Sequence, residues 1–254
     1  MTNSNPLANF PRGRDWDAHW IWNAQAPARN AWVLFRCEFD LADTTDARLF
    51  ISADTRYRVW INGQYLGDGP PQSQPYHQYY DERDIVALVQ PGHNCIAVIV
   101  QHQGVQDSAR GGLLAEILDG QDHCVSASGG DWRCLLGSAW KQNANFCGMN
   151  RIGPFQEHVD LRALPVGWMA VGFDDSGWQE PSPPGRGGTD PWCGIAGSLD
   201  VPLVMPWCRL VPRDIDHIVE TDAYATAVTV VEECIDLATR RGPGDLSMSL
   251  SQAG

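Results

Sequence analysis

Apolar and polar residues alternate along the first part of the chain with a period of two. The clearest alternation occupies Leu49–Ala53 and Tyr57–Ile61, and this period is typical of half-buried strands. The Asn62-Gly63 pair that follows the second run predicts a two-residue β-hairpin. Pro91-Gly92 predicts another turn, before the apolar run Ile96–Val100, whose Val and Ile content indicates a core strand.

Further runs of similar texture predict more strands: HWIWN (19–23), WVLFRCEFDL (32–41) and GLLAEIL (112–118). The pattern as a whole predicts an all-β fold, a jelly-roll-like antiparallel β-sandwich over residues 19–180 that follows a loose leader, residues 1–18. A Pro/Gly-rich extended linker is expected over 181–224, and a partial β element with a disordered tail over 225–254. The Val and Thr content of Ala225–Ala238 favours a strand, although its second half also fits a helix.

Composition limits the classes of partner. The chain has 254 residues and a formal net charge of -13, which argues against nucleic acid and an anionic membrane surface and favours a neutral or cationic ligand. No stretch has the length of a signal peptide or a transmembrane helix, so we expect a cytoplasmic protein. The eleven Trp residues are expected mostly in the β core, with a few available to stack on sugar rings.

The eight cysteines show neither CxxC pairing nor the ligand spacing of a zinc site. Several lie at apolar positions within predicted strands, where a free thiol behaves as a small hydrophobic group. We therefore expect reduced, structural cysteines.

Four sequence blocks, taken in order, resemble one known family. They are ARLFISADTRYRVWINGQYLGDGP, then YYDERDIVALVQPGHNCIAVIV, then GLLAEILDG with DWRCLLGSAW, and finally QEHVDLRALPVGWMAVGFDDSGW. Together they resemble the N-terminal, non-catalytic β-sandwich region of bacterial α-L-rhamnosidases, the family 78 glycoside hydrolases. The resemblance covers roughly residues 19–180.

The resemblance implies a part of a glycoside hydrolase rather than a whole one. The family's catalytic site lies in an (α/α)₆ barrel further along the chain, and nothing after Trp192 could supply its helices. The implied function is non-catalytic recognition of carbohydrate, with terminal L-rhamnose as the sugar and further hydrolase domains as partners. One alternative is a purely structural interaction module without sugar binding. A second alternative is an autonomous glycosidase or lyase that uses Glu157 and Asp160, the nearest pair of carboxyl groups.

A polar cluster in an otherwise apolar aromatic stretch supplies candidate ligand-binding residues: Gln156, Glu157, Asp160 and Arg162. Carboxylate and amide groups bind vicinal hydroxyl groups, and the ring of Trp140 offers an aromatic face. The structural alternative is a buried ion pair between Asp160 and Arg162.

A second group of candidates lies in the loop after the predicted hairpin. Asp68, Tyr76 and His77 form a possible ligand rim, because loops on rigid sheets often carry binding residues. The alternative for the neighbouring Tyr79 and Tyr80 is that they belong to the next strand, with one of them buried.

The sequence indicates no metal site and no cofactor. GxSxG, HExxH, Walker and GxGxxG motifs are absent in a suitable context. Some modules that resemble this region bridge protein and sugar through calcium, and Asp54, Asn62 or Asp68 could supply oxygen ligands, but no EF-hand-like spacing supports this. We interpret Asp174 and Asp175 as turn and capping residues.

Overall fold

The computed structural model describes five parts of the chain: residues 14–73, 78–104, 111–145, 155–182 and 210–217. One compact unit comprises Met1–Ile215, and the remainder, Asp216–Gly254, forms a second unit of which only Asp216 and His217 are described. The predicted element at Ala225–Ala238 and the candidate residues Tyr76 and His77 lie outside the described residues.

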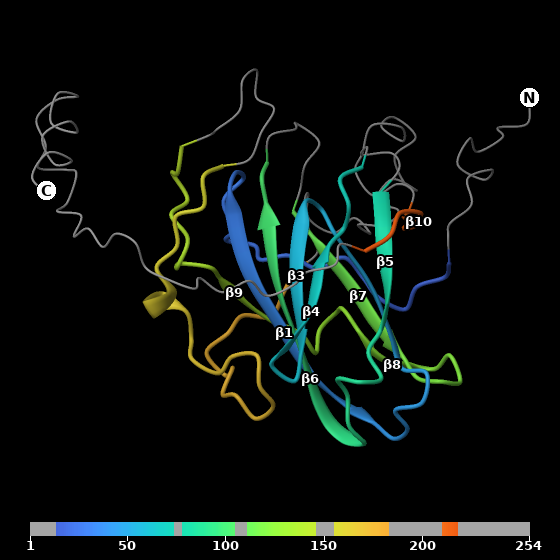
Figure 1. Cartoon of the computed structure of the whole chain (residues 1–254). Coiled ribbons are helices and arrows are strands. Elements are labelled where there is room, and N and C mark those ends of the chain that lie inside the picture. The colour runs from blue at the N-terminus through green and yellow to red at the C-terminus, as the bar shows by residue number, and fades with distance from the viewer. Residues whose placement is uncertain (1–13, 74–77, 105–110, 146–154, 183–209, 218–254) are drawn as a thin grey trace, which may run out of the picture. The chain divides into compact units, whose positions relative to one another are not determined.

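Two five-stranded sheets make up the first unit, and this confirms the predicted all-β sandwich (Figure 1). The first sheet has the order β4 (Gln64–Gly69), β3 (Arg56–Ile61), β6 (Gly92–His102), β1 (Ala31–Leu41) and β9 (Arg133–Leu136). The second has the order β10 (Leu210–Pro212), β5 (Gln78–Asp84), β2 (Arg48–Ala53), β7 (Leu113–Leu118) and β8 (Cys124–Ala127). All neighbours pair antiparallel except β10 and β5, which are parallel.

The core lies between the sheets, on the alternating positions that the sequence predicts. Leu49 and Ile51 of β2 face Val59 of β3 and Val98 of β6 in one buried cluster, and each is fully buried. Burial of an aliphatic side chain of this size stabilises the fold by about 1.5–3 kcal/mol. Tryptophans add to the interior as predicted, and those buried among the described residues are Trp20, Trp22, Trp32, Trp132, Trp140 and Trp168.

The predicted hairpin is confirmed at Asn62-Gly63, which joins β3 to β4. Asn62 and Gly63 have φ angles of 50° and 79°, as a type I′ turn requires. The Asn62 side chain donates to the carbonyl of Leu88 (3.0 Å) and accepts from the amide of Cys95 (2.8 Å). The turn is thereby fixed against the neighbouring strand.

The expected first strand at residues 19–23 is wrong. Ile21 and Trp22 form only isolated bridges, the first with Leu113 and the second with Ser182. Because two consecutive residues bond to two different segments, this part of the chain does not follow one neighbouring strand.

The outer face of the first sheet is covered by largely irregular chain, namely the described residues 137–145 and 155–182. Trp168 and Trp178 of this segment pack over β1, β6 and β3, in a cluster with Trp32, Leu34 and Ile99. Asp174 accepts from the amide of Ser176 (3.1 Å), as expected of a turn residue. Asp175 begins a turn in which its carbonyl accepts from the amide of Trp178 (2.8 Å). Its side chain also forms an ion pair with Arg36, which is 1% exposed, and the sequence did not predict this contact.

The cysteines among the described residues are free thiols: Cys37, Cys95, Cys124 and Cys134. Burial raises the pKa of Cys37 and of Cys95 to about 11, so these thiols remain protonated at neutral pH. This agrees with the structural role expected from the sequence.

Candidate functional site

The outer face of the β3–β4 hairpin carries the first two residues of the candidate site. Arg58 of β3 lies directly opposite Asp68 of β4 in the strand register. Directly opposed residues share one face of a sheet. Arg58 is exposed and Asp68 is half-buried, so a cation and an anion lie side by side at the edge of the sheet.

Glu157 joins this face through pairing between two irregular segments. Trp140 forms an antiparallel bridge with Val159, and the amide of Lys141 donates to the carbonyl of His158 (2.9 Å). Glu157 Oε1 then accepts from Trp140 Nε1 at 3.0 Å and lies 3.9 Å from Arg58 Nη1. Asp68, Arg58 and Glu157 therefore form one row of alternating charge, which we call the Arg58 row.

Trp140 orients Glu157 of this row through a hydrogen bond and does not offer a ring face for stacking. Its ring is 7% exposed and lies parallel to Trp32, with centroids 4.6 Å apart and planes inclined by 7°. Since the stacked ring is buried, its contribution to a site is the indole N–H that holds Glu157.

Asp160 and Arg162 do form an ion pair, but it is not buried. Both carboxylate oxygens of Asp160 accept from Arg162, at 2.8 and 2.7 Å, and the two side chains are 51% and 90% exposed. Asp160 also caps the 3-10 helix Leu161–Ala163 by accepting from the amide of Arg162 (3.1 Å). The hydrogen bonds from Arg162 hold the pKa of Asp160 below its ordinary value, so this carboxylate stays ionised.

The remaining candidates are placed less centrally. Gln156 is exposed, and its side-chain oxygen lies 3.4 Å from His158 Nε2. Tyr79 and Tyr80 belong to β5, and Tyr80 is buried, as the structural alternative expected. The Asp68 carbonyl accepts from Arg83 (2.7 Å), which fixes this part of β4.

Within the described parts of the chain, no group of three or more His, Cys, Asp or Glu side chains could hold a metal ion. Asp54, one of the oxygen ligands considered for calcium, pairs with His102 at 2.6 Å and accepts from Thr55 at 3.0 Å. The Asn62 side chain is occupied in its turn. These two residues are thus used structurally.

Arg58 is the residue of the row that sequence reasoning missed. It precedes the Asn62-Gly63 turn, so the hairpin signal does locate it on a strand opposite the end of β4. The register that brings Asp68 to the same face depends on a bulge between Val59 and Trp60, which the sequence does not reveal.

No helix within the described ranges is long and apolar enough to cross a membrane. Among known proteins, a curated α-L-rhamnosidase from Formosa agariphila is 26% identical over 212 residues, which are 70% of this chain and 22% of the relative. The crystal structure of a family 78 rhamnosidase from Bacillus sp. GL1 matches with 37% identity and a TM-score of 0.66, and covers 81% of this chain and 20% of that one.

The Streptomyces avermitilis α-L-rhamnosidase, solved in complex with L-rhamnose, matches with 26% identity and a TM-score of 0.50 over 66% of this chain and 17% of that one. The chain thus spans about a fifth of the length of the relatives it matches. The family model for the α-L-rhamnosidase N-terminal domain matches residues 42–184, which include both sheets except β1 and β10. This chain belongs to the α-L-rhamnosidase N-terminal domain family.

Proposed function

We propose that the chain is a non-catalytic carbohydrate-recognition module of an α-L-rhamnosidase-like glycoside hydrolase, with terminal L-rhamnose as its ligand. Membership of the N-terminal domain family and the Streptomyces avermitilis relative solved with L-rhamnose support the class of ligand. The observation that carries the proposal is the Arg58 row, where charged donors and acceptors lie at the surface beside a buried tryptophan pair.

The row has the chemistry that a hydroxylated ligand needs. Arg58 donates hydrogen bonds, whereas the carboxylates of Asp68 and Glu157 accept them, so vicinal hydroxyl groups find both kinds of partner. The described contacts of Glu157 use Oε1, and Oε2 would accept from the sugar. The Arg58 side chain is 48% exposed, so it can reach a ligand without any opening of the fold.

Hydrolysis by Glu157 and Asp160 finds less support. A glycosidase needs one carboxyl group that gives up a proton at the working pH. Asp160 is held as an ion by Arg162, with both oxygens occupied, so it is poorly suited to act as that acid or as a nucleophile.

The test is isothermal titration of the purified chain with L-rhamnose and a panel of other monosaccharides, with and without calcium. Saturable binding of L-rhamnose that weakens about tenfold in Glu157→Gln and in Arg58→Gln is expected, since each loses a hydrogen bond to a charged group. Arg133→Gln, which changes an arginine of β9, is the matched control. If the folded chain gives no binding heat with any of the sugars, the proposal is overturned.

A specific observation also favours the structural alternative. Leu161 and Val166 are 69% and 96% exposed, and Val159 beside them is 41% exposed. Exposed apolar side chains that gather in one segment are typical of a surface that another domain covers. Binding of a separately produced rhamnosidase catalytic domain, lost in a Leu161→Ser/Val166→Ser double variant, together with no sugar binding, would favour this function.

A further inference from the structure

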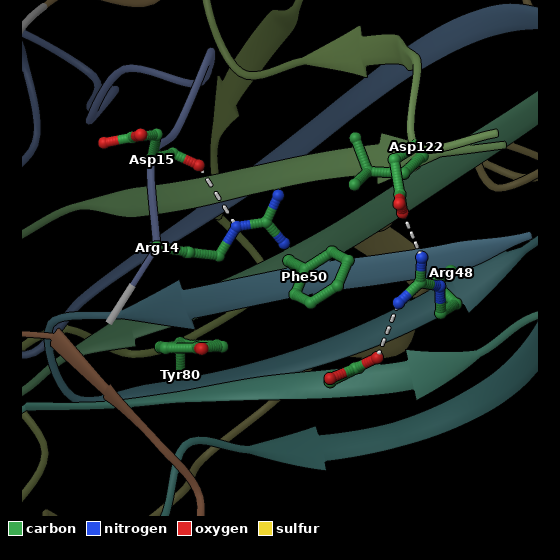
Figure 2. Close-up of a pocket in the computed structure, with 8 residues that line it drawn as sticks. Arg14, Asp15, Arg48, Phe50, Tyr80 and Asp122 are labelled. Atoms are coloured by element: carbon green, nitrogen blue, oxygen red, sulfur yellow. Dashed lines mark hydrogen bonds and ion pairs between the residues drawn. The ribbon is translucent and has the colours of Figure 1, made fainter. Parts of the chain in front are cut away.

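The outer face of the second sheet holds a pocket, on the sheet that does not carry the Arg58 row. Its volume is about 400 Å³, within the range of roughly 300–1,000 Å³ that is typical of small-molecule sites. Residues from the leader, β2, β5, β7 and the turn before β8 line it: Arg14, Asp15, Arg48, Phe50, Tyr80, Glu82, Leu118 and Asp122 (Figure 2).

Two aromatic rings form the floor of this pocket. Phe50 of β2 and Tyr80 of β5 have ring centroids 6.3 Å apart, and they are 5% and 6% exposed. Trp16 of the leader packs edge-on against both rings, at 6.4 and 5.4 Å. The floor is therefore rigid, but both rings are almost fully buried and Arg14 lies over Phe50, so a ligand meets the polar walls of the pocket rather than an open aromatic face.

Two arginines stand on opposite sides of the Phe50 ring, as Figure 2 shows. The Arg14 guanidinium carbon lies 3.6 Å from the ring centroid, and that of Arg48 lies 5.6 Å away. Arg14 is anchored by the buried Glu116 at 2.5 Å. Arg48 is anchored by Glu82 at 3.1 Å and by Asp122.

Both arginines keep N–H donors that these contacts do not use. A guanidinium has five N–H donors, and the described bonds of Arg48 use only its Nη1 and Nη2 atoms. Those of Arg14 use Nε and Nη2. Three acidic residues line the pocket against two arginines, so the charge does not favour an anion.

We propose that this pocket binds one pyranose unit of a neutral saccharide. The pyranose lies between the polar walls above this closed floor; its hydroxyl groups accept from Arg14 and Arg48, and they donate to Glu82 or Asp122. This inference rests on the proposed carbohydrate recognition and adds a second site for the same class of ligand on the opposite sheet. No bond is made or broken there.

Chemical-shift mapping by NMR separates this site from the first one. The ¹⁵N-labelled wild-type chain is titrated with methyl α-L-rhamnopyranoside, D-galactose and D-glucose. Saturable shifts of the amides of Arg48, Phe50 and Glu82 are expected with at least one of these sugars. The Arg58 row is followed in the same spectra through Arg58 and Glu157, so the two sites report independently.

Variants then assign the binding to side chains. Arg48→Gln and Glu82→Gln change groups that are 34% and 51% exposed, so the fold is expected to survive. Each should weaken binding at the pocket about tenfold, the loss expected for one hydrogen bond to a charged group. Arg133→Gln, on the first sheet, should leave this affinity unchanged.

Each outcome of the titration decides between the two sites. Shifts near the Arg58 row alone would overturn the pocket and leave the proposed function standing. Shifts at the pocket alone would support this inference and move carbohydrate recognition away from the Arg58 row. Absence of saturable shifts at both places with all three sugars would overturn both proposals.

Discussion

Arg36 is a fully buried charged residue in the middle of β1, directly after the apolar run Ala31–Phe35. Its guanidinium donates to the carbonyls of Trp168 and Ala170, both at 3.1 Å, and pairs with Glu38 and Asp175. A lone arginine in an apolar run does signal a buried partner. The sequence could not name that partner, because Asp175 is 139 positions away along the chain.

Replacing Arg36 with Met is expected to lower the free energy of unfolding by roughly 3–5 kcal/mol, the usual cost of removing one partner of a buried charge pair. The carbonyls of Trp168 and Ala170 would lose their donor, and Asp175 its cation. Urea denaturation measures the change. Arg162→Gln, which breaks an exposed pair, should unfold at the wild-type urea concentration. Equal midpoints for Arg36→Met and wild type would contradict the role of Arg36 as an anchor.

His93 gives a pH dependence at the same scale. Hydrogen bonds to Asp40 and Glu38 raise the pKa of His93 above its ordinary value of 6.5. Because the folded pKa is raised, the stabilisation is fully present below about 6.5 and is lost as the pH rises through the folded value. NMR titration of the imidazole should show the raised pKa. In His93→Gln, the free energy of unfolding should no longer fall as the pH rises from about 6.5 through the folded pKa of His93. A His93 pKa at or below 6.5 would contradict the pairing.

At the scale of elements, the hairpin was predictable and its bulge was not. Asn-Gly after an alternating run indicates the turn, and β3 and β4 follow from it. One extra residue in β4 shifts the register between Val59 and Trp60, so that Asp68 rather than Gly67 opposes Arg58. Without the bulge, the period of two would direct Asp68 toward the core. The candidate site therefore depends on a β-bulge that no pattern in the sequence predicts.

The turn itself can be tested by two replacements of Asn62. Asn62→Gly keeps the positive φ but loses the side-chain bonds to Leu88 and Cys95, whereas Asn62→Ala loses the bonds and also strains the backbone. The alanine variant should be less stable than the glycine variant by about 1–2 kcal/mol, the cost of a left-handed conformation. Urea midpoints of the two variants measure this difference. If alanine matched glycine, strain at this turn would be negligible.

At the scale of the whole first unit, the sequence predicts which strand residues face the core but not what covers the outer faces. The described residues 137–145 and 155–182 cover one sheet without any regular period, so their packing could not be foreseen. On the other sheet, Ala18 of the leader and Leu210 of β10 join a cluster with Phe50 and Tyr80. These two residues come from chain expected to be loose or linking, and tertiary packing holds them in place.

Glu116 connects the leader to the second sheet, and its removal tests how this face is closed. The carboxylate accepts from the amides of Asp17 and Ala18, at 2.9 and 3.1 Å, and binds Arg14. Glu116→Gln loses the ion pair, so local opening of the leader should increase about tenfold or more. Trypsin cleavage after Arg14, followed by mass spectrometry, should accelerate accordingly, while the exposed control Glu180→Gln keeps the wild-type rate. Because Arg14 also forms one wall of the pocket, the same variant should weaken saccharide binding there. Unchanged cleavage would mean that the aromatic contacts of Trp16 hold the leader without this carboxylate.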